Sequence, residues 1–168
     1  MIQKLNESNA LYQGEEFEEN TLFSGGSLEG KTAVLRLRRV NERAVLTYKQ
    51  RFHSDSPIKF QREEETEIAD AEAMSAILIS LGFIPALVYE KRRKTWQVNN
   101  VEIVVDELPF GFYMEIEGDE DAIINTEKLF GFEHFEAEEM TYPNLTLKLG
   151  KRNGDLIEAR FDTAIIGV

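Results

Sequence analysis

The sequence predicts a single α+β domain built from antiparallel strands with a few covering helices. Strand-like segments, in which apolar and polar residues alternate with period two, cover most of the chain. Short polar connections between them favour hairpins, and two segments of helical periodicity interrupt the series. Consecutive antiparallel strands with a few helices are typical of α+β folds. The expected strands span roughly 16–23, 33–40, 43–50, 59–69, 86–97, 100–108 and 111–118.

Turn residues separate some of these strands. Asn41-Glu42 lies between two of them and predicts a tight hairpin, and Gly111, just after Pro109, predicts another. Both positions carry residue types that tolerate the backbone of a tight turn.

Cap residues mark the two expected helices. Asp70 is a good N-cap for a first helix that ends at Gly82, and a second helix runs from about 119 to 130 and is closed by Gly131. The segment 142–149 fits a strand or a helix equally well. The residues expected to be buried are Met74, Ile77, Leu78, Leu81, Ile123, Leu129 and Phe130.

Composition narrows the class of protein. The chain has 168 residues, 42% of them hydrophobic and 30% charged, which fits one domain with a real core. It has no cysteine, so disulfides, thiolate catalysis and zinc–thiolate sites are excluded. The net charge of −12 argues against nucleic acid and anionic membranes as partners. Without a long apolar run or a signal peptide, we expect a cytoplasmic protein with no membrane contact.

The polar faces of the expected strands are unusually rich in charge. Basic and acidic residues lie on separate strands, with few uncharged polar residues among them. An ordinary sheet with one face in water would also place charges there. If the sheet instead closes into a barrel, the charges line a lumen with a cationic and an acidic side. The residues concerned are Arg36, Arg38, Lys49, Glu63, Glu65, Lys91, Arg93, Asp106, Glu115 and Glu117.

Such a lumen suits a polyphosphate held together with a divalent metal. Arginine and lysine bind phosphate oxygens, and carboxylates are the hard oxygen ligands that Mg²⁺ or Mn²⁺ prefers. The charge pattern therefore predicts a phosphate-binding and metal-binding tunnel.

Several stretches resemble the CYTH family, the triphosphate tunnel enzymes, which include class IV adenylyl cyclases, thiamine triphosphatases and inorganic triphosphatases. They follow the family's order and cover most of 17–145: "AVLRLRR", "AVLTYKQ", "REEETEIADAEAMSAILISLGF", "VYEKRRKTWQVNNVEIVVDELPFGFYMEIEG" and "TYPNL". The resemblance implies a closed eight-stranded antiparallel β-barrel with a charged lumen that binds a triphosphate and Mg²⁺ or Mn²⁺.

The resemblance also implies roles for the charged residues. The phosphate ligands would be Arg36, Arg38, Lys49, Lys91 and Arg93. The metal ligands would be Asp106, Glu115 and Glu117, with Glu63 and Glu65 on the acidic side of the lumen. The expected activity is metal-dependent hydrolysis of a phosphoanhydride in an inorganic or organic triphosphate. The alternatives are a class IV-type adenylyl cyclase and a catalytically impaired or engineered polyphosphate-binding scaffold.

The family's opening strand, Glu-x-Glu-x-Lys, is absent from the N-terminus. The tail "LIEAR" fits it, with Leu156, Glu158 and Arg160 in the three key positions. "DTAIIGV" then resembles the first half of the helix that follows, and "IQKLNE" its second half. The chain is therefore read as a circular permutant, a single domain over 1–168 with 150–155 as the join. The alternative is a truncated domain with an unrelated tail that pairs as an edge strand.

If the tail is the displaced strand, Glu158 and Arg160 are catalytic candidates that point into the lumen. Leu156 replaces the first glutamate of the motif, and Met140 stands where family members often have a basic residue. Both departures favour the non-catalytic alternative. The expected partners are a triphosphate-containing small molecule and a second copy of the chain, with which terminal segments could be exchanged.

Overall fold

The computed structural model describes residues 2–52 and 60–162. It confirms an α+β fold with one large sheet and four helices. The helices are α1 (Ile2–Asn6), α2 (Ala71–Ser80), α3 (Glu120–Phe130) and α4 (Tyr142–Leu149), and a 3-10 turn, η1, spans Gly26–Leu28. The strands are β1 (Leu11–Gly25), β2 (Ala33–Val40), β3 (Arg43–Phe52), β4 (Phe60–Ile68), β5 (Phe83–Val98), β6 (Val101–Leu108), β7 (Gly111–Glu117), β8 (Lys151–Asn153) and β9 (Leu156–Ala159).

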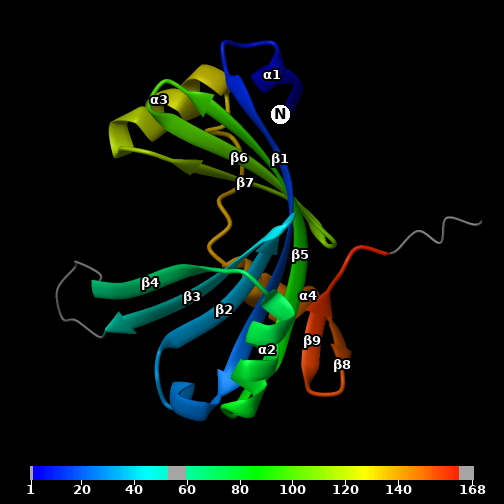
Figure 1. Cartoon of the computed structure of the whole chain (residues 1–168). Helices are drawn as coiled ribbons and strands as arrows, with labels where there is room; N and C mark the ends of the chain where they lie inside the picture. The colour runs from blue at the N-terminus through cyan, green and yellow to red at the C-terminus, as the bar shows by residue number, and fades with distance from the viewer. Residues whose placement is uncertain (1, 53–59, 163–168) are drawn as a thin grey trace, which may run out of the picture.

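The sheet is strongly bent, as Figure 1 shows, with β2, β3 and β4 on one limb and β6 and β7 on the other. The strand order is β4-β3-β2-β1-β5-β6-β7, and the long strands β1 and β5 join the two limbs. No ladder joins β4 to β7 in the described parts of the chain, so hydrogen bonds do not close the sheet into the expected barrel. The bend nevertheless gives the sheet a concave and a convex side.

The two hairpins predicted from turn residues are present. Val40 pairs with Arg43 across the turn at Asn41, whose φ of 53° is left-handed. Asparagine tolerates this conformation better than most residues. Leu108 pairs with Gly111 at the β6–β7 turn.

The helix caps also follow the sequence prediction. The Asp70 side chain accepts a hydrogen bond of 2.9 Å from the Ala73 amide at the start of α2. Gly131, with a φ of 66°, ends α3 in the left-handed conformation. The ambiguous segment 142–149 is a helix, capped by Thr141. Within the described residues, the helices are too short or too polar to span a membrane.

Three residues expected in the core are exposed: Ile77 at 51%, Leu81 at 66% and Leu129 at 69%. Helix α2 instead buries Ala71 and Leu78, seven residues apart and therefore on one stripe of the helix. Leu78 is therefore buried as predicted, and Met74 is partly buried against the same cluster. The apolar pattern of α2 is wider than the stripe that contacts the sheet, so periodicity also predicted burial for residues beside that stripe.

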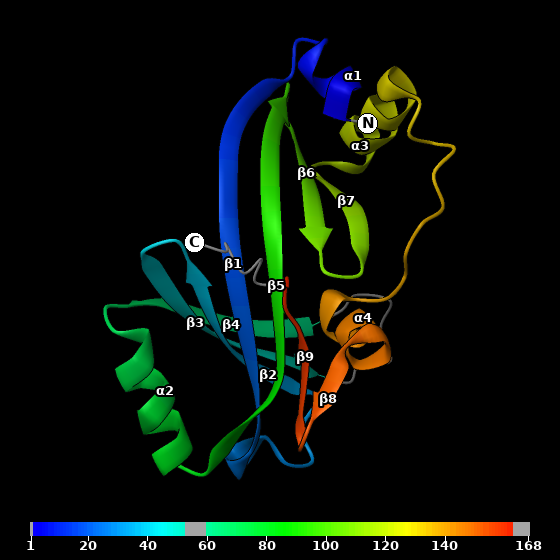
Figure 2. The same ribbon diagram turned by 90° about the vertical axis from the view of Figure 1, so that its right-hand side faces the viewer.

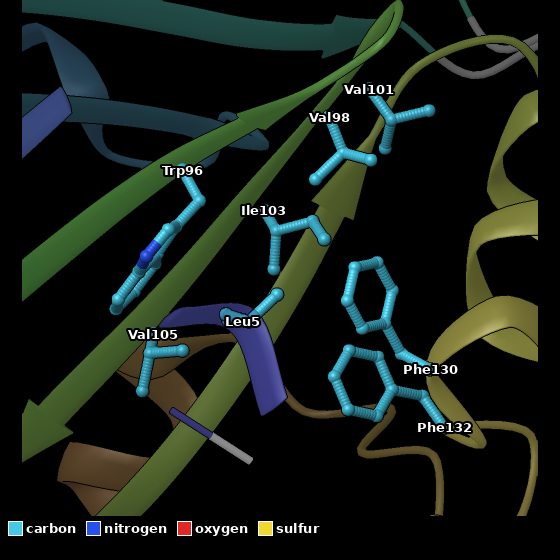
Figure 3. Packing of buried hydrophobic residues seen from close by; sticks show 8 residues of the cluster. All are labelled: Leu5, Trp96, Val98, Val101, Ile103, Val105, Phe130 and Phe132. Atoms are coloured by element: carbon cyan, nitrogen blue, oxygen red, sulfur yellow. The ribbon is translucent and has the colours of Figure 1, made fainter. Parts of the chain in front are cut away.

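Two hydrophobic clusters pack the convex side. Figure 3 shows the cluster at the β5–β6 end, where Leu5 of α1 and Phe130 of α3 meet Trp96 and Ile103 of the sheet. A second cluster joins α2 to β2 around Leu35, Leu37 and Leu78. These clusters cover the convex side of the strands and leave the predicted charged residues on the concave face.

Candidate functional site

Strand registers place the predicted charged residues of the sheet on one face. Arg38 pairs with Asn20 and Asn20 with Tyr89, while Glu18 pairs with Lys91 on the same row of strands. Residues opposite each other in a ladder project to the same side, so one shared face follows. The predicted residues on this concave face are Arg36, Arg38, Lys49, Glu63, Glu65, Lys91, Arg93, Asp106, Glu115 and Glu117.

The limb of β2, β3 and β4 carries a basic corner. Lys49 Nζ lies 2.8 Å from Glu63 Oε1, and Arg38 Nη2 lies 3.7 Å from Glu65 Oε2. Arg36 donates through Nη2 to the Thr47 hydroxyl at 3.4 Å. The hydrogen bond of Arg36 and the ion pair of Arg38 are therefore long, and the ion pair of Lys49 is partly exposed. Such contacts contribute little stability, so an anionic ligand can replace them at little cost.

Two guanidinium nitrogens of this corner have no acceptor. The Nε atoms of Arg36 and Arg38 are buried and lack a hydrogen-bond partner in the described structure. The Nε of Arg39 is also unpartnered, but Arg39 lies on the convex side, where its Nη atoms reach Glu19 and Glu72. Buried donors without acceptors are costly. Arg36 and Arg38 differ from Arg39 in that each lines a hollow of the concave face, where an acceptor can reach its guanidinium group.

A denser network occupies the centre of the concave face. Arg93 donates through Nε and Nη2 to the two oxygens of Asp106, at 2.8 and 2.6 Å, and through Nη2 to Glu115 at 2.8 Å. Lys91 Nζ lies 3.4 Å from both Glu18 and Asp106. These contacts form a chain of alternating charges across β1, β5, β6 and β7.

Helix α4 covers one side of this network. Tyr142, its first residue, donates its hydroxyl hydrogen to Asp106 Oδ2 at 2.8 Å. Its ring packs against Tyr89 and Tyr113, and Lys91 Nζ lies 5.5 Å from the ring centre. These three tyrosines thus form an aromatic group beside the buried charges.

Burial and charge shift the pKa values of these groups. Burial lowers the pKa of Lys91 despite the opposing effect of Glu18 and Asp106. Burial alone would raise the pKa of Asp106, but hydrogen bonds from Arg93 and the nearby Lys91 charge bring it below its ordinary value. Burial and the Asp106 charge raise the pKa of Tyr142, which keeps its hydroxyl protonated as a donor. The network therefore holds Asp106 ionised.

Two hollows open on either side of this network. A hollow of about 740 Å³ lies at the basic corner and is lined by Arg36, Lys49, Tyr89 and Tyr142. A second, of about 460 Å³, is lined by Arg38, Glu18, Glu65 and Arg93. Arg36 and Arg38, two residues apart on β2, each face one hollow. A chain of phosphates lying across β2 would reach both.

The expected metal ligands do not form a ready cluster. No group of three or more histidine, aspartate or glutamate side chains suited to a metal is found among residues 2–52 and 60–162. Asp106 is fully buried and both its oxygens accept hydrogen bonds, which does not support it as an open metal ligand. Glu115 is partly exposed and contacts Arg93 only through one oxygen, and Glu117 is exposed two residues away. Of Asp106, Glu115 and Glu117, the last two are the more accessible to a metal, and Glu63 and Glu65 on the opposite limb are also exposed.

The tail contributes a strand, but its faces are the reverse of those expected. Strand β9 pairs in parallel with β5, with Glu158 opposite Val88 and Ala159 opposite Tyr89. Ala159 therefore packs on the concave side, and Glu158 lies on the convex side. A shift of one residue in register exchanges the two faces of a strand, which explains the reversal.

Convex-face charges hold the tail in this register. Arg160 forms ion pairs with Glu19, with Glu90 at 2.9 Å and with Glu158 at 3.1 Å. The amide of Phe161 donates to Glu90 at 2.8 Å. The expectation that Glu158 lies beside Glu115 and Glu117, with Arg160 among the phosphate ligands, is wrong. The circular permutation is not established by these contacts, and its expected helix at 163–168 lies outside the described residues.

Sequence reasoning missed three site residues: Glu18, Asn20 and Tyr142. Glu18 and Asn20 are buried on β1, and the Asn20 Oδ1 atom has no partner in the described structure. Strand alternation over 16–23, "EFEENTLF", puts Glu18 and Asn20 on the same face as the apolar Leu22. This pattern was the one sign in the sequence that the two polar residues could be buried. Tyr142 had no such signal because the structure of its segment was ambiguous.

Comparison with known proteins identifies the family. A model of the CYTH domain matches residues 2–143. The chain belongs to the CYTH family. Comparison with curated proteins gives no match.

Solved structures share this CYTH fold. The PH1012 protein of Pyrococcus horikoshii OT3 is 24% identical with a TM-score of 0.70, covering 86% of this chain and 90% of that one. The PH1819 protein of the same organism is 26% identical with a TM-score of 0.67, covering 88% and 92%. A Hippeastrum protein, described as an adenylyl cyclase candidate with a dominant triphosphatase activity, is 18% identical with a TM-score of 0.54, covering 77% and 81%.

Proposed function

We propose that this CYTH protein binds a triphosphate-containing small molecule on its concave face and hydrolyses one of its phosphoanhydride bonds with Mg²⁺ or Mn²⁺. The observation that carries the proposal is the pair of buried, unpartnered Nε atoms of Arg36 and Arg38 between the two hollows. Phosphate oxygens are acceptors that match a guanidinium in charge and geometry. Family membership and the triphosphatase activity described for the Hippeastrum relative support the same substrate class.

The basic corner would bind the phosphate chain. Arg36 and Arg38 would each exchange a weak contact for hydrogen bonds to phosphate oxygens. Lys49 would exchange its partly exposed ion pair with Glu63 for a contact with the more highly charged phosphate chain. Their charges would stabilise the negative charge that develops on the leaving phosphates. A ligand that contacts both this corner and Arg93 would bridge the two limbs of the sheet. We therefore expect the tunnel to be closed by the bound ligand and not by hydrogen bonds between strands.

The residues present fit a metal that arrives with its substrate. Mg²⁺ is commonly held by one or two carboxylates together with substrate phosphates. Glu115 and Glu117 would provide those carboxylates, while Asp106 would position Arg93 and Lys91. Bound in this way, the metal would offset phosphate charge and help to place the attacking water.

Phosphate release tests the proposal. The substrates are tripolyphosphate, ATP and thiamine triphosphate, each with Mg²⁺, with Mn²⁺ and with EDTA. We expect metal-dependent release from at least one of them, lost in Arg36→Ala/Arg38→Ala. Conversion of ATP to cyclic AMP without release of orthophosphate would show a cyclase instead. Binding of triphosphates without turnover would leave only a binding module.

A further inference from the structure

A second surface, distinct from the concave charged face, lies along the free edge of β7. We call it the β7 groove. It is a hollow of about 850 Å³ with an apolar floor from β7, α3 and the residues after α3. Figure 2 shows the connection from α3 to α4 descending beside β7. Its apolar lining residues include Phe112, Met114, Ile116, Ile123, Phe132 and Phe135.

The groove runs along an unpaired strand edge. Strand β7 pairs with β6 on one side and is the last strand of the sheet in the described chain. Tyr113 and Met114 are neighbours that point to opposite faces of β7, and both line the groove. The hollow therefore reaches around the edge itself. Unpaired strand edges accept an added strand through main-chain hydrogen bonds.

Large apolar side chains are exposed here. Phe112 is 67% exposed and Phe135 is 54% exposed. Phe135 stacks on the buried Phe132, with ring centres 5.4 Å apart, so its exposed face is held in a fixed orientation. A rigid, exposed aromatic ring beside an apolar floor is typical of an anchor for a partner side chain.

The charges around the groove have one sign. Glu127, Glu136, Glu138 and Glu139 line it, and no lysine or arginine lines it in the described part of the chain. An acidic rim around an apolar floor complements a partner that carries basic residues. Glu138 and Glu139 also line the hollow at the basic corner, whereas Glu127 and Glu136 line only the β7 groove.

We propose that the β7 groove binds an extended segment of another protein chain in which apolar residues alternate with lysine or arginine. The segment adds a strand to β7. Its apolar side chains lie on the convex side of β7 and contact Phe112 and Phe135. Its basic side chains project to the opposite side of the added strand and face Glu138 and Glu139, which line both this groove and the hollow at the basic corner. This proposal does not depend on the activity of the concave face.

Peptide binding tests the proposal. The probe is a fluorescein-labelled nonapeptide of alternating valine and lysine, measured by fluorescence anisotropy with the full chain in 150 mM NaCl. Two control peptides are one with glutamate in place of lysine and one with a central proline, which removes a backbone donor. We expect both controls to bind at least about tenfold more weakly than the valine–lysine peptide. The glutamate peptide loses the attraction to the acidic rim, and the proline peptide loses a main-chain hydrogen bond to β7.

Variants locate the binding surface. Glu138→Gln/Glu139→Gln and, separately, Phe135→Ala and Phe112→Ala should each weaken binding of the valine–lysine peptide about fivefold or more. The matched control Glu29→Gln/Glu42→Gln removes the same charge from exposed residues that do not line the groove, and it should leave binding unchanged. Because Phe112 projects from an exposed strand, its variant remains informative if Phe135→Ala does not fold.

Hydrogen exchange gives the third measurement. The peptide should slow exchange of amides within residues 111–117. Equal binding of the proline peptide, equal weakening by the control double variant, or protection elsewhere in the chain would each overturn the proposal. An absence of binding at millimolar peptide would do the same.

Discussion

Arg93 and Asp106 form a two-armed ion pair at the centre of the concave face, with N–O distances of 2.8 and 2.6 Å. Asp106 is fully buried and also accepts the Tyr142 hydroxyl. Removing its charge would leave Arg93 and Lys91 without their shared partner in a site of low dielectric constant. Asp106 therefore serves first to keep two cations in place.

Asp106→Asn should lower the free energy of unfolding by about 3–5 kcal/mol, the usual cost of breaking one side of a buried ion pair. Urea unfolding at neutral pH measures it. Glu107→Gln is the matched control on the next residue, because the Arg92–Glu107 pair is partly exposed and should contribute less than about 1 kcal/mol. Similar losses in the two variants would contradict the structural role of Asp106.

The same pair predicts a dependence of stability on pH. Arg93 and Lys91 bring the pKa of Asp106 below its ordinary value of 3.8 against the effect of burial. The unfolded chain thus takes up this proton at a higher pH than the folded chain, so the contribution is fully present above about pH 4 and is lost below it. The difference in stability between the parent and Asp106→Asn should shrink as the pH is lowered from about 6 to about 3. A constant difference would be inconsistent with an ionised Asp106.

Arg160 links the tail to three carboxylates, those of Glu19, Glu90 and Glu158. Arg160→Ala would leave like charges close together, so it should destabilise the protein by about 1 kcal/mol at low ionic strength. Salt screens this repulsion, and the loss should fall as NaCl is raised to 1 M. Thermal unfolding at both salt concentrations measures the effect, with the exposed Arg62→Ala as control. A loss that grows with salt would rule out the charge explanation.

Leu156 lies on the same face of β9 as Glu158, away from the concave side. Leu156→Glu should therefore leave Mn²⁺-dependent phosphate release within about twofold of the parent, since a carboxylate there cannot reach the substrate hollows. The sequence motif predicted the opposite, that this change restores a missing ligand. Increased turnover in Leu156→Glu would show that the tail enters the concave side in solution.

Alternation predicted the faces of the main strands well because each had one apolar and one charged side. Leu35 and Leu37 contact α2, so Arg36 and Arg38 must face the other way. The tail also has a charged side, with Glu158 and Arg160, and an apolar side, with Ala159, yet its charged side faces away from the concave face. Pairing with β5 and the Arg160 contacts decide this orientation, and neither is visible in the sequence.

Some site residues could not be predicted because they are buried by strands that are distant in the sequence. Glu18 resembles any exposed glutamate in the sequence, yet pairing of β1 with β5 buries it against Lys91. The exposed Leu129 shows the converse, because an apolar residue on a helix is buried only where a neighbour covers it.

The central claim is that Arg36 and Arg38 bind a triphosphate, and isothermal titration calorimetry of tripolyphosphate in the presence of MgCl₂ tests it most directly. We expect saturable binding to the parent, loss of at least about 2 kcal/mol of binding free energy in Arg36→Ala/Arg38→Ala, and no change in Arg39→Ala, whose side chain contacts Glu19 and Glu72 on the convex face. No binding to the parent, or equal losses in the Arg39 and Arg36/Arg38 variants, would contradict the assignment of the concave face as a triphosphate site.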